Sequence, residues 1–466
     1  MARATEQALV LGGGVAGIAA AVTLADAGLR VRLVEKRPLL GGRASSFIDG
    51  ERRIDEGQHA TLRCCTQLAA LFEKLGVQDK IRWLDTIHYL DRQGRISTLS
   101  ACALPAPLHT AVSFWRLPFL TASEKLAISR ALLAVLRHRP APKDDDSDVA
   151  SWLRERGQPP AALERFWRPI LIGSCNEELD RISLGSAVKV LREGLLQDRR
   201  AFHLGVPAAP LADLYTEPAI AYLGARGGCA SLRATVASLV FDGERIAGAR
   251  LVGGEEIEAE AVVSALPFDQ LLKLLPAERT EGVDYFENLR RLESSPIVGV
   301  HLWLDRSIDC PHALCLLDRE SQWVFNKSRN FGLPESDGTY LSVVISAARR
   351  MAALPKEEVL EIVAAELREC LPEMREAQIR AWRVVKARKA TFCPLPGVEA
   401  LRPDQHSPIS GLYVAGEWTR TGWPSTMEGA ALSGIAAASY LLDDLGAGSS
   451  RYQGTLITAM RRVPRR

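Results

Sequence analysis

The first part of the chain alternates short apolar runs with glycine-rich and small-residue stretches. Residues 8–11 are apolar, residues 12–17 contain four glycines, residues 18–27 are small and mostly apolar, and residues 29–34 follow a closing Gly28. A short apolar run bounded by glycine is typical of a buried strand, and a longer run of small residues is typical of a packed helix. The pattern predicts a strand, a tight turn, a helix and a second parallel strand, which together form a βαβ unit.

Helix and strand patterns then alternate along the chain without an internal repeat. Apolar residues at helical spacing predict helices at 67–75, 121–139, 149–156, 165–196 and 356–371, with a final helix after the last strand. Strands are predicted at 81–90, 96–99, 238–241, 246–252, 261–264, 298–304, 340–345 and 412–415. This alternation favours an α/β fold of more than one layer.

Composition and charge limit the classes of protein to which the chain can belong. Of the 466 residues, 47% are hydrophobic and 24% are charged, which is typical of a folded enzyme of more than one unit. The 58 basic and 56 acidic residues give a net charge of +2, which provides no general footprint for nucleic acid. No nucleic-acid partner is therefore expected.

Three features that suggest a membrane or a metal have simpler interpretations. Residues 8–25 are uncharged, but their glycines favour a strand and turn over a signal peptide, and no uninterrupted apolar run predicts a spanning helix. The aspartates at 144, 145, 146 and 148 precede a helix and are interpreted as its solvated first turn. The nine cysteines include no CxxC pair, so reduced thiols and no metal site are expected.

The glycine-rich turn has the spacing of a dinucleotide-binding loop. Gly12, Gly14 and Gly17, with Val15 and Ala16 between the last two, form GxGxxG between a strand and a helix. The first glycine makes the turn, the second lets the backbone approach a pyrophosphate, and the third lets the helix pack against the strand.

Glu35 ends the next predicted strand, 18 residues after Gly17, and Lys36 follows it. A carboxylate at this point accepts both ribose hydroxyls of an adenosine and disfavours a 2′-phosphate. The motif therefore predicts FAD or NAD rather than NADP as the cofactor.

The residues that follow Glu35 distinguish FAD from NAD through a resemblance to known proteins. Gly41-Gly42-Arg43 resembles the GGR loop of the amine oxidases and phytoene desaturases, in which this loop touches the FAD pyrophosphate. The resemblance implies that Gly42 and Arg43 bind FAD, with Arg43 supplying a positive charge. FAD is therefore the predicted cofactor.

Residues 411–430 resemble the second flavin signature of the same superfamily. Ser425 and Glu428 have capping-box spacing, which predicts a helix with outward-facing backbone amides, suited to the negative charge of a reduced flavin. The resemblance implies contact with the adenine edge through Val236, with the ribityl and pyrophosphate region through Glu417, and with the ring through Trp423 and Pro424. The cofactor-binding residues implied here are Val236, Gly416, Glu417, Trp423, Pro424, Thr426, Met427, Glu428 and Ala430.

Two further segments resemble a narrower group, the hydroxysqualene dehydroxylases. Residues 55–59 resemble their D-x-GQH segment, and residues 210–228 resemble their PL-x-DLY…EPA…YL-x-ARGG stretch. The resemblance extends to about residue 444 and implies that reduced FAD removes the hydroxyl of hydroxysqualene to give squalene. The expected route is ionisation to an allylic cation followed by hydride transfer.

Such a reaction requires an acid near the substrate oxygen. His59, Asp55 and Glu56 are the candidates, because the family's corresponding loop runs close to the isoalloxazine. The alternative for each is a packing role beneath the ring. Alternatives for the whole chain are a carotenoid-type desaturase or another amine-oxidase-family flavoenzyme, a prenyl-binding escort protein without catalysis, and an NAD-dependent dehydrogenase.

The resemblance also implies a domain organisation. A discontinuous Rossmann-like FAD-binding domain comprises residues 1–85, 215–275 and 405–445. A substrate domain of mixed sheet comprises residues 86–214 and 276–404, with a helical cap around 110–200, and residues 446–466 form a basic tail.

An isoprenoid substrate has almost no polar group, so it requires an apolar site. Residues 96–115 carry no charge and, with the apolar residues up to 120, are interpreted either as a surface resting on a membrane or as a buried core. The tail's basic residues are a second candidate for lipid contact, namely Arg461, Arg462, Arg465 and Arg466. The expected location is the cytoplasm, with peripheral contact at the inner face of the membrane as an alternative; no oligomeric state is predicted.

Overall fold

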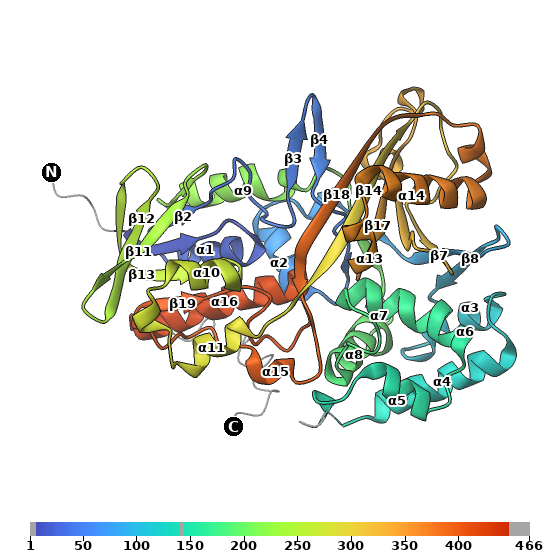
Figure 1. Ribbon diagram of the computed structural model, residues 1–466, viewed down its shortest axis with the longest axis horizontal. Coiled ribbons are helices and arrows are strands. Elements are labelled where there is room, and N and C mark those ends of the chain that lie inside the picture. Colours follow the sequence, from blue (N-terminus) through green and yellow to red (C-terminus); the bar gives the residue numbers. More distant parts are fainter. Residues whose placement is uncertain (1–5, 140, 142–143, 447–466) are drawn as a thin grey trace.

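The computed structural model describes residues 6–139, 141 and 144–446. Two seven-stranded sheets lie at opposite ends of the molecule, one at the left and one at the right of Figure 1. A group of helices, at the lower right of Figure 1, packs beside the second sheet. The mixed α/β class predicted from the sequence is confirmed.

The first sheet takes its strands from three distant parts of the chain. Its parallel part has the order β10 (Cys229–Ser231), β2 (Val31–Val34), β1 (Glu6–Leu11), β13 (Glu256–Ser264) and β19 (Leu412–Val414). An antiparallel meander extends from β13 through β12 (Arg245–Leu251) to β11 (Val236–Asp242). The predicted βαβ unit is confirmed, and its first strand lies near the centre of the sheet.

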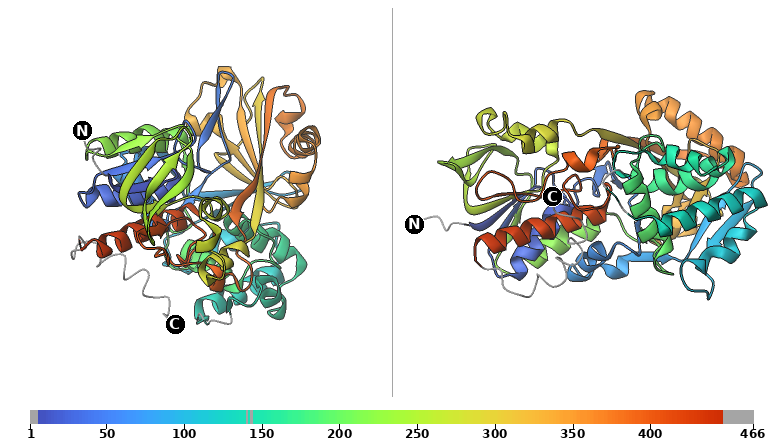
Figure 2. Two further views of the ribbon diagram at one scale, coloured as in Figure 1. Left: turned by 60° about the vertical axis from the view of Figure 1, so that its left-hand side comes forward. Right: turned by 90° about the horizontal axis from the view of Figure 1, so that it is seen from below.

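Small residues let two helices pack closely beside this sheet. Helix α1 (Val15–Asp26) is buried along nearly its whole length and runs beside the C-terminal helix α16 (Met427–Asp444), red in Figure 2. A Cβ atom on Gly434 would lie 2.1 Å from the Ala16 carbonyl oxygen, so the contact requires glycine. Helix α1 begins at Val15, three residues earlier than the predicted helical run, because Gly14 already serves as its N-cap.

Other helices complete the two faces of the first sheet. Helices α2 (Thr66–Lys74) and α9 (Ala212–Gly224) pack on the side of α1 and α16. Helices α10 (Phe268–Leu274), α11 (Asp284–Arg290) and α15 (Val398–Leu401) lie on the opposite side.

The second sheet has the order β18 (Ile379–Phe392), β14 (Ser294–Leu304), β17 (Tyr340–Ile345), β16 (Trp323–Asn326), β15 (Ala313–Leu316), β7 (Thr86–Leu90) and β8 (Ile96–Ser100). Helices α13 (Arg349–Ala353) and α14 (Lys356–Cys370) cover one face. Alternate residues of β14, such as Val298, Val300 and Leu302, are buried against that cover, as the twofold repeat of a strand requires.

The strand predicted at 81–90 is two strands. Strand β6 (Ile81–Leu84) joins β5 (Thr61–Leu62) and β9 (Leu204–Pro207) in a three-stranded sheet. Strand β7 joins the second sheet instead, after a break at Asp85. Apolar alternation does not show which sheet a strand enters, so the prediction of one strand was wrong here.

A separate hairpin, β3 (Ser46–Asp49) with β4 (Arg52–Asp55), projects between the two sheets in Figure 1.

The remaining helices form a cap. They are α3 (Ala111–Arg116), α4 (Ala122–Arg137), α5 (Val149–Glu155), α6 (Pro160–Ala162), α7 (Arg168–Cys175) and α8 (Leu184–Leu191). The short helix α12 (Lys327–Phe331) packs against β16 and β17 of the second sheet instead. The continuous helix predicted at 165–196 is interrupted, because Asn176 adopts a left-handed conformation and ends α7. No helix among residues 6–139 and 144–446 is long and apolar enough to cross a bilayer.

The aspartates before α5 were predicted to form a solvated first turn, and this is wrong for Asp144, which is buried. Asp148 caps α5 by accepting a hydrogen bond from the Ser151 backbone N–H at 2.7 Å. Asp144 is buried and accepts from the Ala141 N–H at 2.6 Å. Burial raises the pKa of Asp145 to about 6. Its carboxylate accepts from the Glu399 N–H, so it ties the segment before α5 to helix α15.

Candidate flavin site

The glycine turn and the GGR loop lie directly against each other. A Cβ on Gly17 would lie 1.9 Å from the Gly12 oxygen, and one on Gly42 would lie 2.8 Å from the Gly14 Cα. The Gly41 N–H donates to the Gly13 carbonyl at 2.8 Å. A Cβ on Gly14, in contrast, would meet nothing closer than 3.9 Å. The two loops therefore form a backbone cradle that stays open above Gly14, as a pyrophosphate requires.

Glu35 occupies the ribose end of this cradle. Its buried carboxylate accepts hydrogen bonds from the Gly13 N–H at 2.7 Å and the Arg37 N–H at 2.9 Å. A carboxylate has about four acceptor positions, so two remain for ribose hydroxyls. The Ala234 N–H donates to the Glu35 carbonyl at 2.9 Å, which brings Val236, at the start of β11, to the same end of the sheet. Lys36 is exposed beside them.

Arg43 connects the N-terminal part of the chain with its C-terminal part through hydrogen bonds. Its guanidinium donates to the Glu417 carboxylate at 2.6 Å and to the Ala390 carbonyl at 2.8 Å. Gly416, next to Glu417, has φ +151° and donates its N–H to the Ser433 hydroxyl of α16 at 2.8 Å. The structure thus brings together the predicted residues Gly42, Arg43, Gly416 and Glu417.

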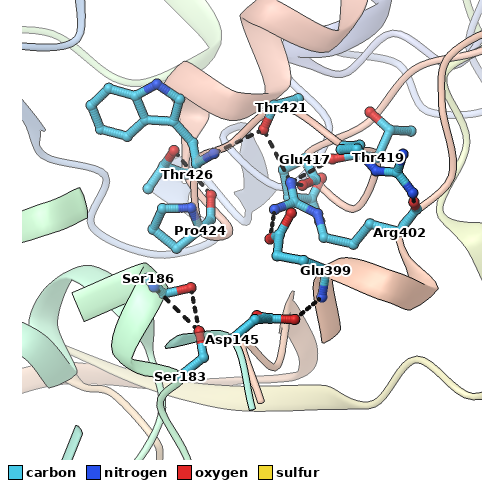
Figure 3. Close-up of polar contacts among 12 residues, drawn as sticks. Asp145, Ser183, Ser186, Glu399, Arg402, Glu417, Thr419, Thr421, Pro424 and Thr426 are labelled. Carbon is cyan, nitrogen blue, oxygen red and sulfur yellow. Dashed lines mark hydrogen bonds and ion pairs between the residues drawn. The ribbon is translucent and has the colours of Figure 1, made fainter. Parts of the chain in front are cut away.

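A buried arginine that the sequence motifs did not indicate supports the loop after Glu417. The Arg402 guanidinium donates to the Glu417 carbonyl and the Thr421 hydroxyl, each at 3.0 Å, and also to the Thr419 carbonyl (Figure 3). It pairs with Glu399 and is about 1% exposed. No pattern around residue 402 marks it, because three of its four partners belong to a loop 15 to 19 residues further along the chain.

Residues 411–430, which resemble the second flavin signature, lead into a helix as predicted. The N-cap residue of this helix differs from the predicted one. Thr426, rather than Ser425, caps α16 by accepting from the Gly429 N–H at 3.1 Å. Glu428 does not complete a capping box. Its carboxylate accepts from the Gln67 and Leu68 N–H groups at 3.0 and 2.8 Å, so it caps α2. Burial raises the pKa of Glu428, and these hydrogen bonds act in the opposite direction.

The other predicted residues of this segment differ in their burial and in the groups they contact. The first backbone N–H groups of α16, at Met427 and Glu428, have no acceptor within the helix and remain suited to an anionic group. Pro424 is buried, and Ala430 is packed against the core. Trp423 is half-buried, with the Lys189 ammonium of the cap 4.7 Å from its ring centre.

Two of the three candidate acids form ion pairs. Asp55 is about 3% exposed and pairs with the fully buried Lys327 at 2.7 Å. Burial acts to raise the pKa of Asp55, but Lys327 and the hydrogen bonds outweigh it and lower the pKa overall. Glu56 pairs with Arg37, which also donates to the Gly42 carbonyl at 3.2 Å. Their contacts therefore suit support of the loop rather than proton donation.

His59 lies in a different environment. Its Nδ1 is 3.3 Å from the Gly57 carbonyl oxygen, and burial lowers the pKa of its imidazole. Neighbouring Gln58 has both amide atoms buried and without a partner among the described residues. A buried amide without partners is costly, so it marks a place where a bound group is expected to supply them.

His59 lines a small, largely apolar cavity of about 10 Å³, room for about one water molecule. The other lining residues are Thr61, Phe72, Ile81, Gly205, Pro207, Leu211, Leu214, Tyr215 and Met427. A larger cavity, about 690 Å³, lies elsewhere, between α7 and the ends of β15, β16 and β17, among charged side chains such as Arg168 and Asp318. None of the residues predicted for the flavin site lines that larger cavity.

These features fit FAD. The glycine cradle is open where the pyrophosphate would lie, Glu35 retains acceptor capacity for ribose, and Gln58 has an unsatisfied buried amide. Among the described residues, no group of three or more His, Cys, Asp or Glu side chains could hold a metal ion.

Comparison with known proteins agrees with this geometry. Residues 15–442 match the family described as flavin containing amine oxidoreductase. The chain is 28% identical over 455 residues to a 15-cis-phytoene desaturase of Synechococcus elongatus, covering 93% of this chain and 95% of the relative. It is 26% identical to a probable zeta-carotene desaturase of the same organism, covering 93% and 98%.

Solved structures show the same fold. Putrescine oxidase bound to putrescine has a TM-score of 0.70 at 16% identity, covering 94% of this chain and 99% of that one. An oxidoreductase from Methanosarcina mazei has a TM-score of 0.70 at 18% identity, covering 92% and 99%.

The fold and the cradle define the protein as an FAD-dependent oxidoreductase. More particularly, the chain belongs to the flavin containing amine oxidoreductase family. This assignment favours an FAD-dependent enzyme over the alternatives of a non-catalytic escort protein and an NAD-dependent dehydrogenase.

Proposed function

We propose that this flavoenzyme reductively removes the hydroxyl group of an allylic isoprenoid alcohol, hydroxysqualene, to give squalene. The observation that carries the proposal is an apolar cavity that contains a single imidazole, that of His59. A long hydrocarbon with one hydroxyl group needs such a lining, because apolar walls bind the chain and a polar side chain among them meets the oxygen.

The cavity lies where the two segments of narrower resemblance meet. The Leu211 N–H donates to the Asp55 carboxylate at 2.9 Å, and the Ala212 N–H donates to the Ser46 hydroxyl at 3.0 Å. Arg53 and Asp213 form an ion pair across the same junction. These contacts hold β3 and β4 against the start of α9, and both segments of narrower resemblance contribute residues to the cavity wall.

The chain's own residues account for the required proton chemistry. A hydroxyl group leaves as water only after it gains a proton, and an allylic position delocalises the resulting positive charge. Because burial lowers the pKa of His59, its protonated form is a stronger acid than an exposed imidazolium. Reduced FAD, when bound, supplies the hydride, so the alcohol, one hydride and one proton give the hydrocarbon and water.

The small volume of the cavity has a consequence for binding. A long isoprenoid enters only if the walls formed by Phe72, Leu214 and Met427 move apart. We expect cofactor and substrate together to stabilise that wider arrangement.

A second candidate function is desaturation of a carotenoid-type polyene. The match to phytoene and zeta-carotene desaturases over more than nine-tenths of the chain favours it. The two reactions run in opposite redox directions. Desaturation consumes oxidised flavin, whereas dehydroxylation consumes reduced flavin.

The test is a pair of anaerobic incubations. Dithionite-reduced protein is mixed with hydroxysqualene, and oxidised protein is mixed with 15-cis-phytoene; products are identified by gas or liquid chromatography with mass spectrometry. We expect squalene from the first mixture and no product from the second. A desaturated product in the second, without squalene in the first, would establish the alternative.

A further inference from the structure

The cap exposes an unusual concentration of large apolar side chains. Among the described residues, seven of the twelve exposed large hydrophobic residues lie between positions 96 and 133. They are Ile96, Leu104, Leu108, Val112, Trp115, Leu126 and Leu133. We call Leu104, Leu108, Val112 and Trp115, together with Leu126, Arg130, Leu133 and Arg137 of α4, the cap surface.

The first half of the cap surface is held in place rather than loosely exposed. The Lys125 ammonium donates to the Trp115 carbonyl at 2.8 Å, and the Ser113 hydroxyl donates to the Ser100 carbonyl at 2.6 Å. Phe114 and Leu117, on either side of Trp115 and Arg116, are buried. The fold therefore anchors α3 and still leaves Trp115 47% and Leu108 55% exposed.

Helix α4 continues this pattern with basic residues added. Ile128, Ala131 and Val135 face the cap interior. On the outer face, Leu126, Arg130, Leu133 and Arg137 follow one another at spacings of four, three and four residues and are all exposed. Alternating leucine and arginine on one helix face is typical of a helix that lies in a lipid interface, because arginine stems pack on apolar surface while their charges reach the headgroups.

The charged residues at positions 96–139 are predominantly basic. Residues 96–139 contain five basic residues, counting lysine and arginine, and one acidic residue, Glu124, a net charge of 5 − 1 = +4 against +2 for the whole chain. Glu124 is used in the capping box of α4. The four arginines, at 116, 130, 137 and 139, form no ion pair with any other residue that the structure describes. Unpaired basic residues around an apolar surface complement an anionic one.

We propose that the cap surface docks on the surface of a bilayer that contains anionic lipid. Its leucines and tryptophan enter the headgroup region, and its arginines contact lipid phosphates. The proposal depends on the exposed side chains and their charges and does not depend on which reaction the enzyme catalyses.

The test is flotation of the FAD-loaded, full-length protein with vesicles. One vesicle set contains phosphatidylcholine with 30% phosphatidylglycerol, and the other contains phosphatidylcholine alone. We expect wild type to bind the anionic vesicles and L108S/W115S to bind them at least about tenfold more weakly. R130Q/R137Q should lose roughly 30-fold in affinity on anionic vesicles, at ~1 kcal/mol for each basic residue, with little change on neutral ones.

Matched controls use exposed residues elsewhere. I48S/V252S removes two apolar side chains that are each 68% exposed and lie outside the cap, and R388Q removes an exposed arginine of β18. Both should bind as wild type does. A variant with glutamine at 461, 462, 465 and 466 examines the basic residues of the C-terminal tail, which lie outside the described residues.

Four outcomes overturn the proposal: wild type that does not float with anionic vesicles, cap variants that bind as wild type does, control variants that weaken as much, or loss of binding only in the tail variant. Bound FAD and the melting temperature verify that each variant is folded. Turnover of detergent-solubilised substrate is measured separately, so failure of vesicle binding and failure of the proposed reaction are distinguishable.

Discussion

Arg43 and Glu417, 374 positions apart in the chain, form an ion pair of 2.6 Å at the mouth of the glycine cradle. Arg43 follows the first parallel strands, and Glu417 follows β19, the last strand to join the same sheet. The cradle is therefore complete only after the last strand has entered the sheet. It follows that cofactor binding reports on the folding of the whole chain, not of its first part alone.

Arg43→Ala should weaken FAD binding by about tenfold or more, because one side chain supplies a charge-assisted hydrogen bond and a positive charge near the pyrophosphate. Equilibrium titration of apoprotein with FAD, followed by flavin fluorescence, measures the change. Arg43→Lys is the matched control that retains the charge. It should recover only part of the affinity, because an ammonium group cannot reproduce the fork that reaches both Glu417 and Ala390. Full recovery with lysine would show that charge alone matters.

Gly14→Ala should fold normally but bind little FAD. Its φ of −73° suits alanine, and the added Cβ would meet no protein atom closer than 3.9 Å, so only the space for the pyrophosphate is lost. We expect a melting temperature of the apoprotein close to that of wild type and an FAD content reduced to a small fraction. Gly185→Ala, in helix α8 with open space around it, is the control and should keep its flavin. A yellow, fully loaded Gly14→Ala protein would contradict the placement of the cradle.

The parts of the site that the sequence predicted are those formed by short, local patterns. The glycine turn and Glu35 belong to one βαβ unit, whose geometry depends on residues close in sequence. The GGR loop follows directly and packs on the same turn. Such elements could be predicted because each residue type meets a local requirement, such as the space that Gly17 leaves for the Gly12 oxygen.

The parts that could not be predicted depend on partners far apart in the sequence. Glu428 has the spacing of a capping box, yet tertiary packing directs it to α2, 360 residues away. Arg402 and Lys327 are fully buried although their residue types are usually exposed. Their burial is possible only because a distant loop or carboxylate supplies the hydrogen bonds, and no periodicity in the sequence records that contact.

Lys327→Met should destabilise the protein by about 3–5 kcal/mol, because it leaves the Asp55 carboxylate buried without its charge partner. Asp55→Asn should have an effect of similar size. The double variant should recover part of the loss, since neither charge then remains buried. Urea denaturation with the same cofactor loading in each variant gives the free energies of unfolding. Additive losses in the double variant would show that the two side chains act independently.

The same pair predicts a pH dependence of stability. The pKa of Asp55 is lowered in the folded protein, so its contribution is present above the unfolded pKa of about 4 and is lost as the pH falls through the folded value. We expect the free energy of unfolding of wild type to fall in that acidic range more steeply than that of the Asp55→Asn/Lys327→Met variant. Parallel pH profiles for the two proteins would contradict this assignment.

His59→Gln should retain FAD and lose catalysis. Burial lowers the pKa of His59 below its usual value near 6.5, and the Gly57 carbonyl offsets this only in part. The protonated imidazole is therefore populated only in acid, and if it protonates the leaving hydroxyl, kcat/KM should rise as the pH falls through that lowered pKa. Glutamine cannot supply the proton, so the rise should disappear and the rate should drop by about 100-fold or more.

His312→Gln is the control, because burial also lowers the pKa of His312 while its ring contacts Asn330 and does not line the cavity. A pH profile that keeps its acid limb in His59→Gln, or loses it in His312→Gln, would remove His59 from the reaction.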